Sequence, residues 1–500
     1  MDAAEQLTQE VYEGRIDLDR LVGLVVSLQR QLQDANQRIA ELEKQCAASA
    51  PAKLEQPFSL RAEEQRQAAR GQHKKRKCKK QGRRGRVTSA DKVAQASKHE
   101  DVFPEGVAPS DCQLSHVRPV WRLEKGQALL IAYHIHRGPH NQYGKIPGVI
   151  GRSEFGIEIL IEIAYLVYVV GLSFDKVCAL LHFFQELRLR KSQADSLLHR
   201  LARHWQKEFD VLCTLLANSL VVHADETRWS LHSVWAFLSE KARLLFVGVH
   251  KDADTLKHIL DPATFAGIMI SDDAAVYANF TASQKCWAHL LRKAIKLTLH
   301  DPSNGEYRQF TDRLLEIYRA ACRSQRDGRL GDSGRARQVA ALEDEILELC
   351  VSMWVAELPP LAAGAENDYR LLVNELMRLL LAQQLFTFVT APPIAQPNGA
   401  SQPVAGTNNE AERTLRGAAQ ARVTGRTSKT LVGARRQTIV SSVLESLRLY
   451  LPHFTLTTVL EEIHRWQAEG RSCFVQLLEK LNLTCAEESV LDRVLPCSSG

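Results

Sequence analysis

The chain of 500 residues contains no run of about 20 apolar residues, the length that a helix needs to span a lipid bilayer. Its longest apolar stretch, Ile157 to Leu172, is interrupted by Glu158 and Glu162 at helical spacing. The first residues are acidic and lack the pattern of a secretory signal peptide. These absences argue against a membrane or secreted protein, and we expect a cytoplasmic one.

Paired cysteines are also missing, because the 11 cysteines are scattered and no Cys-x-x-Cys pair occurs. The pattern excludes a disulfide framework and favours reduced thiols. Four potential zinc ligands lie together, namely Cys112, His116, His134 and His136. Their spacing is poor for a structural zinc site, so we expect these histidines to be hydrogen-bonded or exposed to solvent.

Acidic residues are absent from Gln65 to Ala90, where an otherwise mildly basic chain (net charge +6) carries its densest positive run. Like charges at this density cannot pack, and their natural partner is the phosphate backbone of nucleic acid. A solvated tail or a nuclear-import signal is the alternative. Within this run we predict DNA contacts from Lys74, Lys75, Arg76, Lys77, Lys79, Lys80, Arg83 and Arg84.

A heptad pattern precedes the basic run. Apolar residues alternate at steps of three and four from Leu18 to Leu42, with polar residues between them. Such a narrow apolar stripe is typical of a short coiled coil, which predicts a homodimer or a higher oligomer. The alternative is an amphipathic helix that folds against its own chain.

Two β-branched apolar stretches lead into acidic residues. Leu220 to Val222 is followed by Asp225, and Gly267 to Ile270 is followed by Asp272. Such stretches bury readily as strands, so a carboxylate beyond the end of each strand would be held by a rigid element. On neighbouring strands the two carboxylates would converge, and hard oxygen ligands of this kind suit Mg²⁺.

The segments between these acids predict a hairpin and a helix. Ser233 to Leu238 and Leu244 to Val249 flank a polar turn, and Ala253 to Leu260 has a helical pattern. The order of strand with Asp, hairpin, helix, strand with Asp and helix matches the ribonuclease H fold. We therefore predict an α/β ribonuclease H-like catalytic core.

A third acid is offered by a later helix that opens at Asn408 and Asn409, which are good capping residues. Glu410 and Glu412 in its first turn point about 200° apart on an ideal helix, so only one can face the other acids. With Asp225 and Asp272, this glutamate completes an Asp-Asp-Glu set. Such a set can hold two Mg²⁺ ions about 4 Å apart, the arrangement that cleaves phosphodiesters.

Helical segments surround this core. Upstream, Ser173 is a plausible cap for Phe174 to Gln185, and a basic turn leads to a second helix reaching about Phe209. This arrangement predicts a DNA-binding helix-turn-helix, or else a bundle that only supports the next domain. One apolar helix, Ile157 to Val170, precedes it, and Asp301 to about Thr390 predicts a large helical insertion.

Taken together, the motifs resemble those of the insertion-sequence 66 (IS 66) family of ribonuclease H-like Asp-Asp-Glu transposases. The matching stretches are His223-Ala224-Asp225-Glu226-Thr227, Asp272 through Tyr277, Cys286-Trp287-Ala288-His289 and Asn408-Asn409-Glu410-Ala411-Glu412-Arg413. The resemblance covers nearly the whole chain. It implies Asp225, Asp272 and Glu412 as the catalytic and metal-binding acids, with Glu410 as the competing choice for the third.

Other residues of these motifs receive supporting roles. Cys286 and His289 are two ligands, too few for zinc, and we expect them to shape the floor of the site or touch substrate. Asn408 and Asn409 would support the third acid, and Arg413 and Arg416 would contact DNA. The family's N-terminal module usually carries paired cysteines, whereas this chain has only Cys112 there.

The resemblance implies an insertion-sequence transposase of bacteria, associated with the nucleoid. It would cut the element's ends by Mg²⁺-dependent hydrolysis, with Mn²⁺ as an alternative ion, and then transfer the freed 3′-hydroxyl into target DNA. Its partners would be terminal repeats, target DNA and helper proteins of the element. The alternatives are a catalytically inactive transposase-derived DNA-binding protein and a ribonuclease H-type nuclease.

These expectations divide the chain into eight segments. In order they are a coiled coil (1–46), a basic linker (47–100), a small degenerate zinc-finger-like module (101–150), a helix-turn-helix-like region (151–215), the first part of the core (216–300), a helical insertion (301–406), the second part of the core with the catalytic Glu helix (407–455) and a helical tail (456–500).

Overall fold

The computed structural model describes residues 87–354, 364–395, 399 and 401–495. The predicted coiled coil and the DNA contacts from Lys74 to Arg84 lie outside these residues. Within the described ranges, no helix has both the length and the apolar character needed to cross a membrane.

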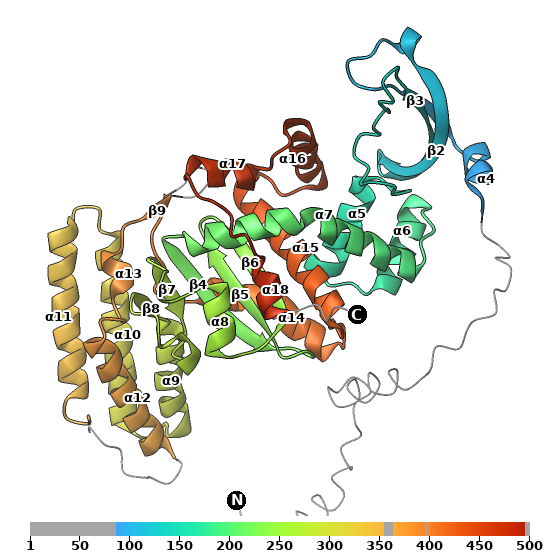
Figure 1. Cartoon of the computed structure of the whole chain (residues 1–500). Helices are drawn as coiled ribbons and strands as arrows, with labels where there is room; N and C mark the ends of the chain where they lie inside the picture. Colours follow the sequence, from blue (N-terminus) through green and yellow to red (C-terminus); the bar gives the residue numbers. More distant parts are fainter. Residues whose placement is uncertain (1–86, 355–363, 396–398, 400, 496–500) are drawn as a thin grey trace, which may run out of the picture. The chain divides into compact units, whose positions relative to one another are not determined.

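The centre of the fold is a mixed five-stranded sheet with the order β6-β5-β4-β7-β8 (Figure 1). Its strands are β4 (Val221–Arg228), β5 (Ser233–Ser239), β6 (Arg243–Val249), β7 (Ile268–Ser271) and β8 (Ser283–Lys285). Strands β4, β5 and β6 are antiparallel, whereas β7 and β8 run parallel to β4. The predicted hairpin is confirmed, and so is the predicted helix before β7, which is α8 (Ala253–Ile259).

Strand β4 is longer than the sequence predicts, so Asp225 lies within it rather than beyond its end. The reason is that β5 pairs with β4 as far as Arg228, and Asp225 lies opposite Ala236. The parallel partner β7 is short and pairs only with Val221 to His223. Asp225 therefore occupies the position where β4 and β7 have just separated.

A glycine allows β7 to approach β4 closely. A Cβ atom on Gly267, the residue before β7, would lie 2.4 Å from the carbonyl oxygen of Ser219 and 2.8 Å from that of Leu220. The Ile268 N–H donates to the Leu220 carbonyl at 2.8 Å. Any side chain at position 267 would push the two acid-bearing strands apart.

The two faces of the sheet are covered by different helices. Val222 and Ala224 of β4 pack into the largest core, which includes residues of α7 (Lys191–Ala217) and α8. The opposite face contributes Val234 and Ala236 to a smaller cluster with Leu415 of α14 (Asn409–Val423). Because side chains alternate along a strand, Asp225 points to the α14 face.

Helix α15 (Leu431–Tyr450) protects the free edge of β6. One face of the helix carries three hydroxyl side chains, spaced four residues apart. Each hydroxyl oxygen accepts a hydrogen bond of 2.9 Å from the backbone N–H of one residue, at every second position of β6. The pairs are Thr438 with Val247, Ser442 with Leu245 and Ser446 with Arg243. The exposed hydrogen-bonding row of an edge strand is thereby satisfied by side chains.

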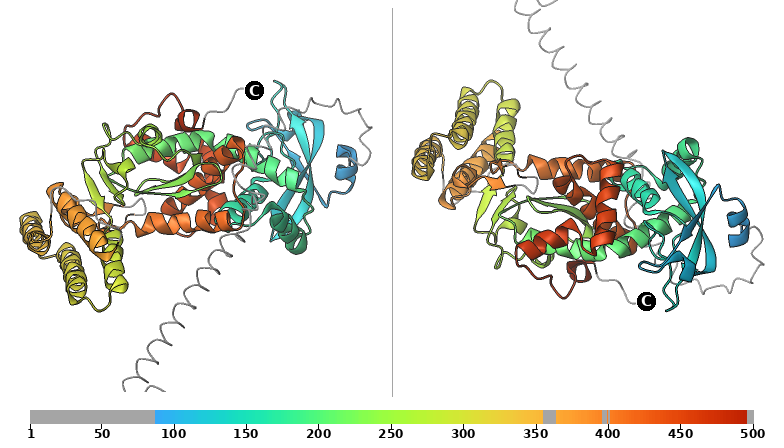
Figure 2. Two further views of the ribbon diagram at one scale, coloured as in Figure 1. Left: turned by 90° about the horizontal axis from the view of Figure 1, so that it is seen from below. Right: turned by 90° about the horizontal axis from the view of Figure 1, so that it is seen from above.

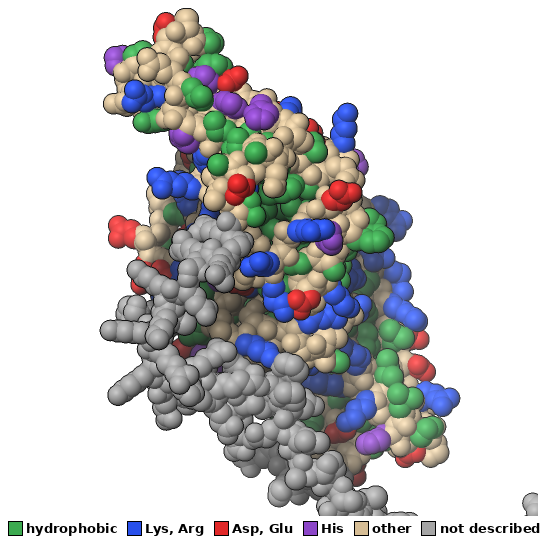
Figure 3. Space-filling view, turned by 90° about the vertical axis from the view of Figure 1, so that its right-hand side faces the viewer, with side chains coloured by type: hydrophobic (Ala, Val, Ile, Leu, Met, Phe, Trp, Pro, Cys, Tyr) green, Lys and Arg blue, Asp and Glu red, His purple; other side chains and the backbone are tan. Residues whose placement is uncertain are grey.

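The N-terminal part of the described chain is a small β module. Helix α4 (Ser89–Ala94) precedes β1 (Lys98–Val102), β2 (Gln113–Glu124) and β3 (Gln127–Arg137), which form a sheet in the order β1-β3-β2. Histidine side chains gather near the top of the face in Figure 3, at the height of β2 and β3 in Figure 1.

These histidines have protein partners. His134 lies 3.0 Å from His99, and His136 contacts Asp101 at 2.8 Å. The side chain of His116 contacts Ser115, and the Cys112 thiol donates to the Ala108 carbonyl. The four residues weighed as zinc ligands form no three-donor group within the described chain.

The helices before the core differ from prediction in two places. Helix α5 (Ile157–Ala164) ends early and continues as a π-helical turn over Tyr165–Val169. Helix α6 (Phe174–Gln185) begins at the predicted Ser173 cap. Helix α7 reaches Ala217 instead of about Phe209, because its buried face continues to Leu216 against the sheet. The helix-turn-helix interpretation of α6 and α7 stays a prediction.

The segment predicted as a helical insertion, from Asp301 to about Thr390, is helical where the structure describes it, and its helices pack together, yellow to orange in Figure 2. It contains α10 (Gly305–Arg326), α11 (Asp332–Cys350), α12 (Ala365–Leu381) and α13 (Thr387–Thr390), followed by the short strands β9 (Ile394–Ala395) and β10 (Ser401–Gln402). Helix α9 (Trp287–His300) precedes the predicted start and packs against α10 and α12. After α15 the chain ends in α16 (Leu456–Glu469), α17 (Cys473–Lys480) and α18 (Val490–Val494).

Candidate active site

The three predicted acids come from three elements on one face of the sheet. Asp225 lies in β4, Asp272 is the first residue after β7, and Glu412 lies in the first turn of α14. Backbone N–H groups orient the two aspartates, since Asp225 accepts from Glu226 at 2.9 Å and Asp272 accepts from Ala274 at 3.0 Å.

Asp225 is the electrostatic centre of this group. The pKa of its carboxyl is raised to about 7, mainly by burial and in addition by the negative charges of Glu226, Asp272 and Glu412. Only the backbone hydrogen bond from Glu226 opposes them. Because both other predicted acids act on Asp225, the three carboxylates share one region of concentrated negative charge.

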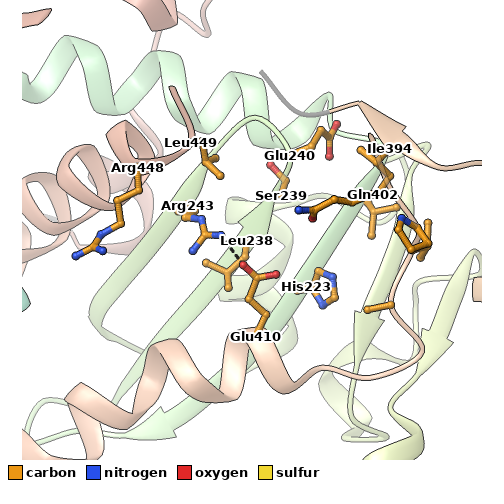
Figure 4. Close-up of a pocket in the computed structure, with 14 residues that line it drawn as sticks. His223, Leu238, Ser239, Glu240, Arg243, Ile394, Gln402, Glu410, Arg448 and Leu449 are labelled. Atoms are coloured by element: carbon orange, nitrogen blue, oxygen red, sulfur yellow. Dashed lines mark hydrogen bonds and ion pairs between the residues drawn. The ribbon is translucent and has the colours of Figure 1, made fainter. Parts of the chain in front are cut away.

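The two glutamates of α14 have different environments. Glu410 forms a salt bridge with Arg243 of β6 at 2.5 Å and lines a cavity of about 420 Å³ that also contains His223 (Figure 4). Glu412 contacts Arg292 of α9 at 2.7 Å and lies 3.6 Å from His289. Glu410 therefore turns towards β6, whereas Glu412 turns towards α9.

Asn408 joins α14 to β4. It is fully buried, its side-chain amide donates to the Ala224 carbonyl at 2.7 Å, and its side-chain oxygen lies 3.3 Å from His223 Nδ1. Asn408 occupies the N-cap position of α14, as predicted, but its side chain makes no capping hydrogen bond. Its amide instead binds the carbonyl of β4 one residue past the last pair with β7.

Cys286 joins α14 to α9. It occupies the N-cap position of α9, and its sulfur accepts the backbone N–H of Asn408 at 3.1 Å. Burial raises the pKa of the Cys286 thiol and lowers that of the His289 imidazole, one turn further along α9. The Cys-Trp-Ala-His motif thus forms one wall of the site, next to Glu412.

Three residues beside the aspartates form a network that sequence reasoning missed. The Tyr277 hydroxyl donates to Glu226 at 2.5 Å, and Lys251 forms an ion pair with the same carboxylate. Burial raises the pKa of Tyr277, and the hydrogen bond to Glu226 raises that of Lys251. The only sequence signal was the alternation in β4, which places Glu226 on the other face from Asp225.

Asp272 and its neighbour Asp273 are also distinguished by their contacts. Asp273 forms an ion pair with Arg378 of α12. The buried ammonium of Lys285 donates to the Asp272 carbonyl at 3.2 Å and to the Ser271 hydroxyl at 3.3 Å. Burial lowers the pKa of Lys285. Asp273 is thereby drawn towards the insertion, and Lys285 fixes the backbone beneath Asp272.

The remaining predicted site residues of α14 are on the surface. Arg413 and Arg416 are exposed on the helix that carries Glu412, and Asn409 is exposed beside the buried Asn408. The two adjacent asparagines therefore differ in environment, although the sequence predicts the same supporting role for both.

The profile described as "Transposase IS66 family" matches residues 152–436, which include the sheet, the insertion, α14 and all three acids. A comparison with curated proteins found no match. The mixed α/β core is consistent with the ribonuclease H-like fold of Asp-Asp-Glu transposases. The chain therefore belongs to the IS66 family of transposases, enzymes that catalyse DNA transposition.

Proposed function

We propose that Asp225, Asp272 and Glu412 are the catalytic acids and that they hold two Mg²⁺ ions, with Mn²⁺ as a substitute. Asp-Asp-Glu transposases generally use divalent metal ions. The reaction is hydrolysis at the element's ends, which frees a 3′-hydroxyl, followed by attack of that hydroxyl on target DNA. When bound, the two metal ions would activate the attacking oxygen and neutralise the charge on the leaving oxygen.

The assignment is supported by the positions of the three acids, in β4, directly after β7 and in the first turn of α14, and by their charges, because those of Asp272 and Glu412 both raise the pKa of Asp225. Carboxylates crowded in this way destabilise one another when ionised. A divalent cation removes that penalty, and oxygen donors are the ligands that Mg²⁺ prefers. The donor set therefore fits the proposed ions.

The protein's own groups position these acids. Asn408 and Cys286 hold the start of α14, the helix that carries Glu412, against β4 and α9. Lys285 steadies the backbone at Asp272. Lys251, whose side chain is 54% exposed, lies at the solvent side of this network while paired with buried Glu226. Rigid supporting contacts of this kind keep a site within the small tolerance that catalysis allows.

The test uses the purified full chain, divalent cation and DNA carrying the element's terminal sequence. Asp225→Asn, Asp272→Asn and Glu412→Gln should each abolish 3′-end cleavage and weaken Mn²⁺ binding measured by calorimetry, while end binding persists. The matched control is Glu410→Gln, which breaks the partly exposed salt bridge to Arg243 and should keep cleavage within about fivefold, since such bridges are worth at most ~1 kcal/mol. The reverse pattern for the two glutamates would make Glu410 the third acid.

We further propose that DNA lies along the exposed face of α14 and is contacted there by Arg413 and Arg416. The basic run from Lys74 to Arg84 would bind the phosphate backbone of the flanking DNA. Exposure of both arginines beside Glu412 supports this path. Removing either arginine should weaken binding and reduce the salt dependence of binding by about one phosphate contact. Unchanged affinity and salt dependence in the double Arg413→Ala, Arg416→Ala variant would remove α14 from the DNA path.

The proposed assembly holds two DNA ends through the predicted coiled coil of residues 1–46, with helper proteins of the element as further partners. Strand transfer requires two ends in one complex, which a dimer supplies. Sedimentation of the full chain with end DNA should give two chains and two ends. A chain that joins ends while strictly monomeric would contradict this assembly.

A further inference from the structure

One group of mixed donors in the described chain lies against the third acid. The sulfur of Cys286, a ring nitrogen of His289 and a carboxylate oxygen of Glu412 all lie within 4.8 Å of one another. The residues come from two elements far apart in sequence, the start of α9 and the first turn of α14. Sequence reasoning dismissed zinc because Cys286 and His289 are only two ligands, and α14 supplies the third.

The separation between the His289 and Glu412 donors suits a tetrahedral ion. Zinc binds sulfur at about 2.3 Å and nitrogen or oxygen at about 2.0–2.2 Å, so neighbouring donors should stand about 3.3–3.8 Å apart. His289 Nδ1 lies 3.6 Å from Glu412 Oε1, too far for a hydrogen bond and within that range. The Cys286 sulfur lies within 4.8 Å of a ring nitrogen of His289 and a carboxylate oxygen of Glu412, so the three donors would have to draw closer to bind one ion.

A second observation points to a ligand at this place. His289 Nδ1 is buried and has no hydrogen-bond partner among the described residues. Buried polar atoms are normally satisfied, so this nitrogen lacks a partner that an ion would provide. The His289 and Glu412 side chains remain 32% and 25% exposed, which leaves a path from solvent.

The chemistry of the donors selects the ion. A thiolate and an imidazole are soft or borderline ligands that favour Zn²⁺, whereas Mg²⁺ prefers oxygen alone. We propose that Cys286, His289 and Glu412 form a Zn²⁺ site, separate in chemistry from the Mg²⁺ centre but sharing Glu412 with it. On binding, the thiol proton of Cys286 leaves to solvent, and water completes the fourth position.

Because Glu412 is also the proposed third catalytic acid, zinc bound at this site should affect cleavage; this step rests on that proposed role. Zinc would hold the third acid towards α9 and away from the aspartates, so it inhibits Mg²⁺-dependent cleavage. Arg292 opposes zinc, because its guanidinium contacts Glu412 Oε1 at 2.7 Å in the free protein. The Arg292 side chain is 56% exposed and can turn into solvent.

The binding test titrates Co²⁺, as a spectroscopic substitute for Zn²⁺, into the metal-free full chain in the presence of excess Mg²⁺. A thiolate-to-cobalt charge-transfer band should appear and be displaced by Zn²⁺. Cys286→Ser should lose the band yet keep its fold, because serine is a good N-cap and its hydroxyl can accept the Asn408 N–H. The matched control is Cys485→Ser, an exposed thiol whose removal should leave the band intact.

Two further variants test the other ligands and the competitor. His289→Ala should weaken cobalt binding at least tenfold even if Cys286→Ser fails to fold, and Glu412→Gln should do the same. Arg292→Gln should tighten binding, because the competing cation is gone. The three-residue site is overturned if the charge-transfer band survives in Cys286→Ser, or if Glu412→Gln leaves the cobalt affinity unchanged.

The activity test adds Zn²⁺ to Mg²⁺-dependent end cleavage, with each protein's rate expressed relative to its own zinc-free rate. Inhibition should follow the same midpoint as zinc binding and should occur at lower zinc in Arg292→Gln. Zinc that binds without inhibiting would refute the sharing of Glu412. A wild-type chain that never cleaves would instead refute the proposed catalytic centre, while the cobalt band would still report the zinc site.

Discussion

Replacing Asn408 by alanine should loosen the contact that holds the third acid in place. Its side chain makes two buried interactions, with the Ala224 carbonyl at 2.7 Å and with His223 Nδ1 at 3.3 Å. Burial lowers the pKa of His223, so at neutral pH the ring is uncharged and its Nδ1 needs a hydrogen-bond partner. Alanine leaves both groups buried and unpaired.

The expected loss of stability follows from these two contacts. An unsatisfied buried polar group costs about 1–3 kcal/mol, and the longer contact to His223 is worth less than the short one, so we expect about 2–4 kcal/mol in total. Catalysis should suffer separately, because a shift of about 1 Å in a positioned group can lower the rate about 10²-fold. Urea unfolding followed by tryptophan fluorescence measures the first effect, and end cleavage measures the second.

The neighbouring asparagine provides a matched control. Asn409 is exposed at the start of the same helix, so Asn409→Ala should change stability by no more than about 0.5 kcal/mol. The reasoning fails if Asn408→Ala and Asn409→Ala unfold at the same urea concentration. It also fails if Asn408→Ala is destabilised but cleaves at the wild-type rate, since Asn408 would then hold the fold and not the site.

Three further predictions concern charge and packing around the aspartates. Glu226→Gln removes a negative charge that raises the pKa of Asp225, so the pH profile of cleavage should move to lower pH. The pKa of the Asp225 carboxyl is about 7 in the folded state, against 3.8 in the unfolded chain, so the folded state holds the proton more tightly. The free energy of unfolding should therefore fall as the pH rises from about 4 to about 7. Urea unfolding at pH 5 and pH 8 measures this loss, and Asp225→Asn should lack it. Gly267→Ala should lower the thermal midpoint because its Cβ meets the Ser219 carbonyl, whereas Gly417→Ala, with open space in α14, should raise stability by about 0.5–1 kcal/mol.

Much of the core follows from the sequence because hydrophobic periodicity is local. The hairpin, α8, β7 and the Ser173 cap each depend on residues within one short window. The extent of β4 was missed because Asp225, Glu226 and Thr227 look like the end of a strand, and only pairing with β5 extends it. Local polarity gave the wrong boundary where a tertiary partner supplied the hydrogen bonds.

The candidate site was only partly predictable for a related reason. The acids could be named from their motifs, yet the buried Lys285 and the Glu226 network depend on which face each strand turns inwards. The environments of Asn408 and Asn409 are also set by packing, since one amide meets a strand carbonyl and the other meets solvent. Such roles require knowledge of contacts between residues that lie 13, 51 and 184 positions apart in the chain.

The connection between β8 and α14 explains how Glu412, far along the chain, could join the two aspartates in the proposed catalytic centre. The chain leaves the core just after β8 and returns just before α14, and the helices α9 to α13 lie between these two points. The Trp287 N–H donates to the Gly406 carbonyl at 3.1 Å and joins the two ends of this excursion, while the Lys285 N–H donates at 2.9 Å to the Gln384 carbonyl between α12 and α13. Because the two ends are hydrogen-bonded to each other, the intervening helices do not loosen the position of α14. Glu412 can therefore be positioned as accurately as if α14 followed β8 directly.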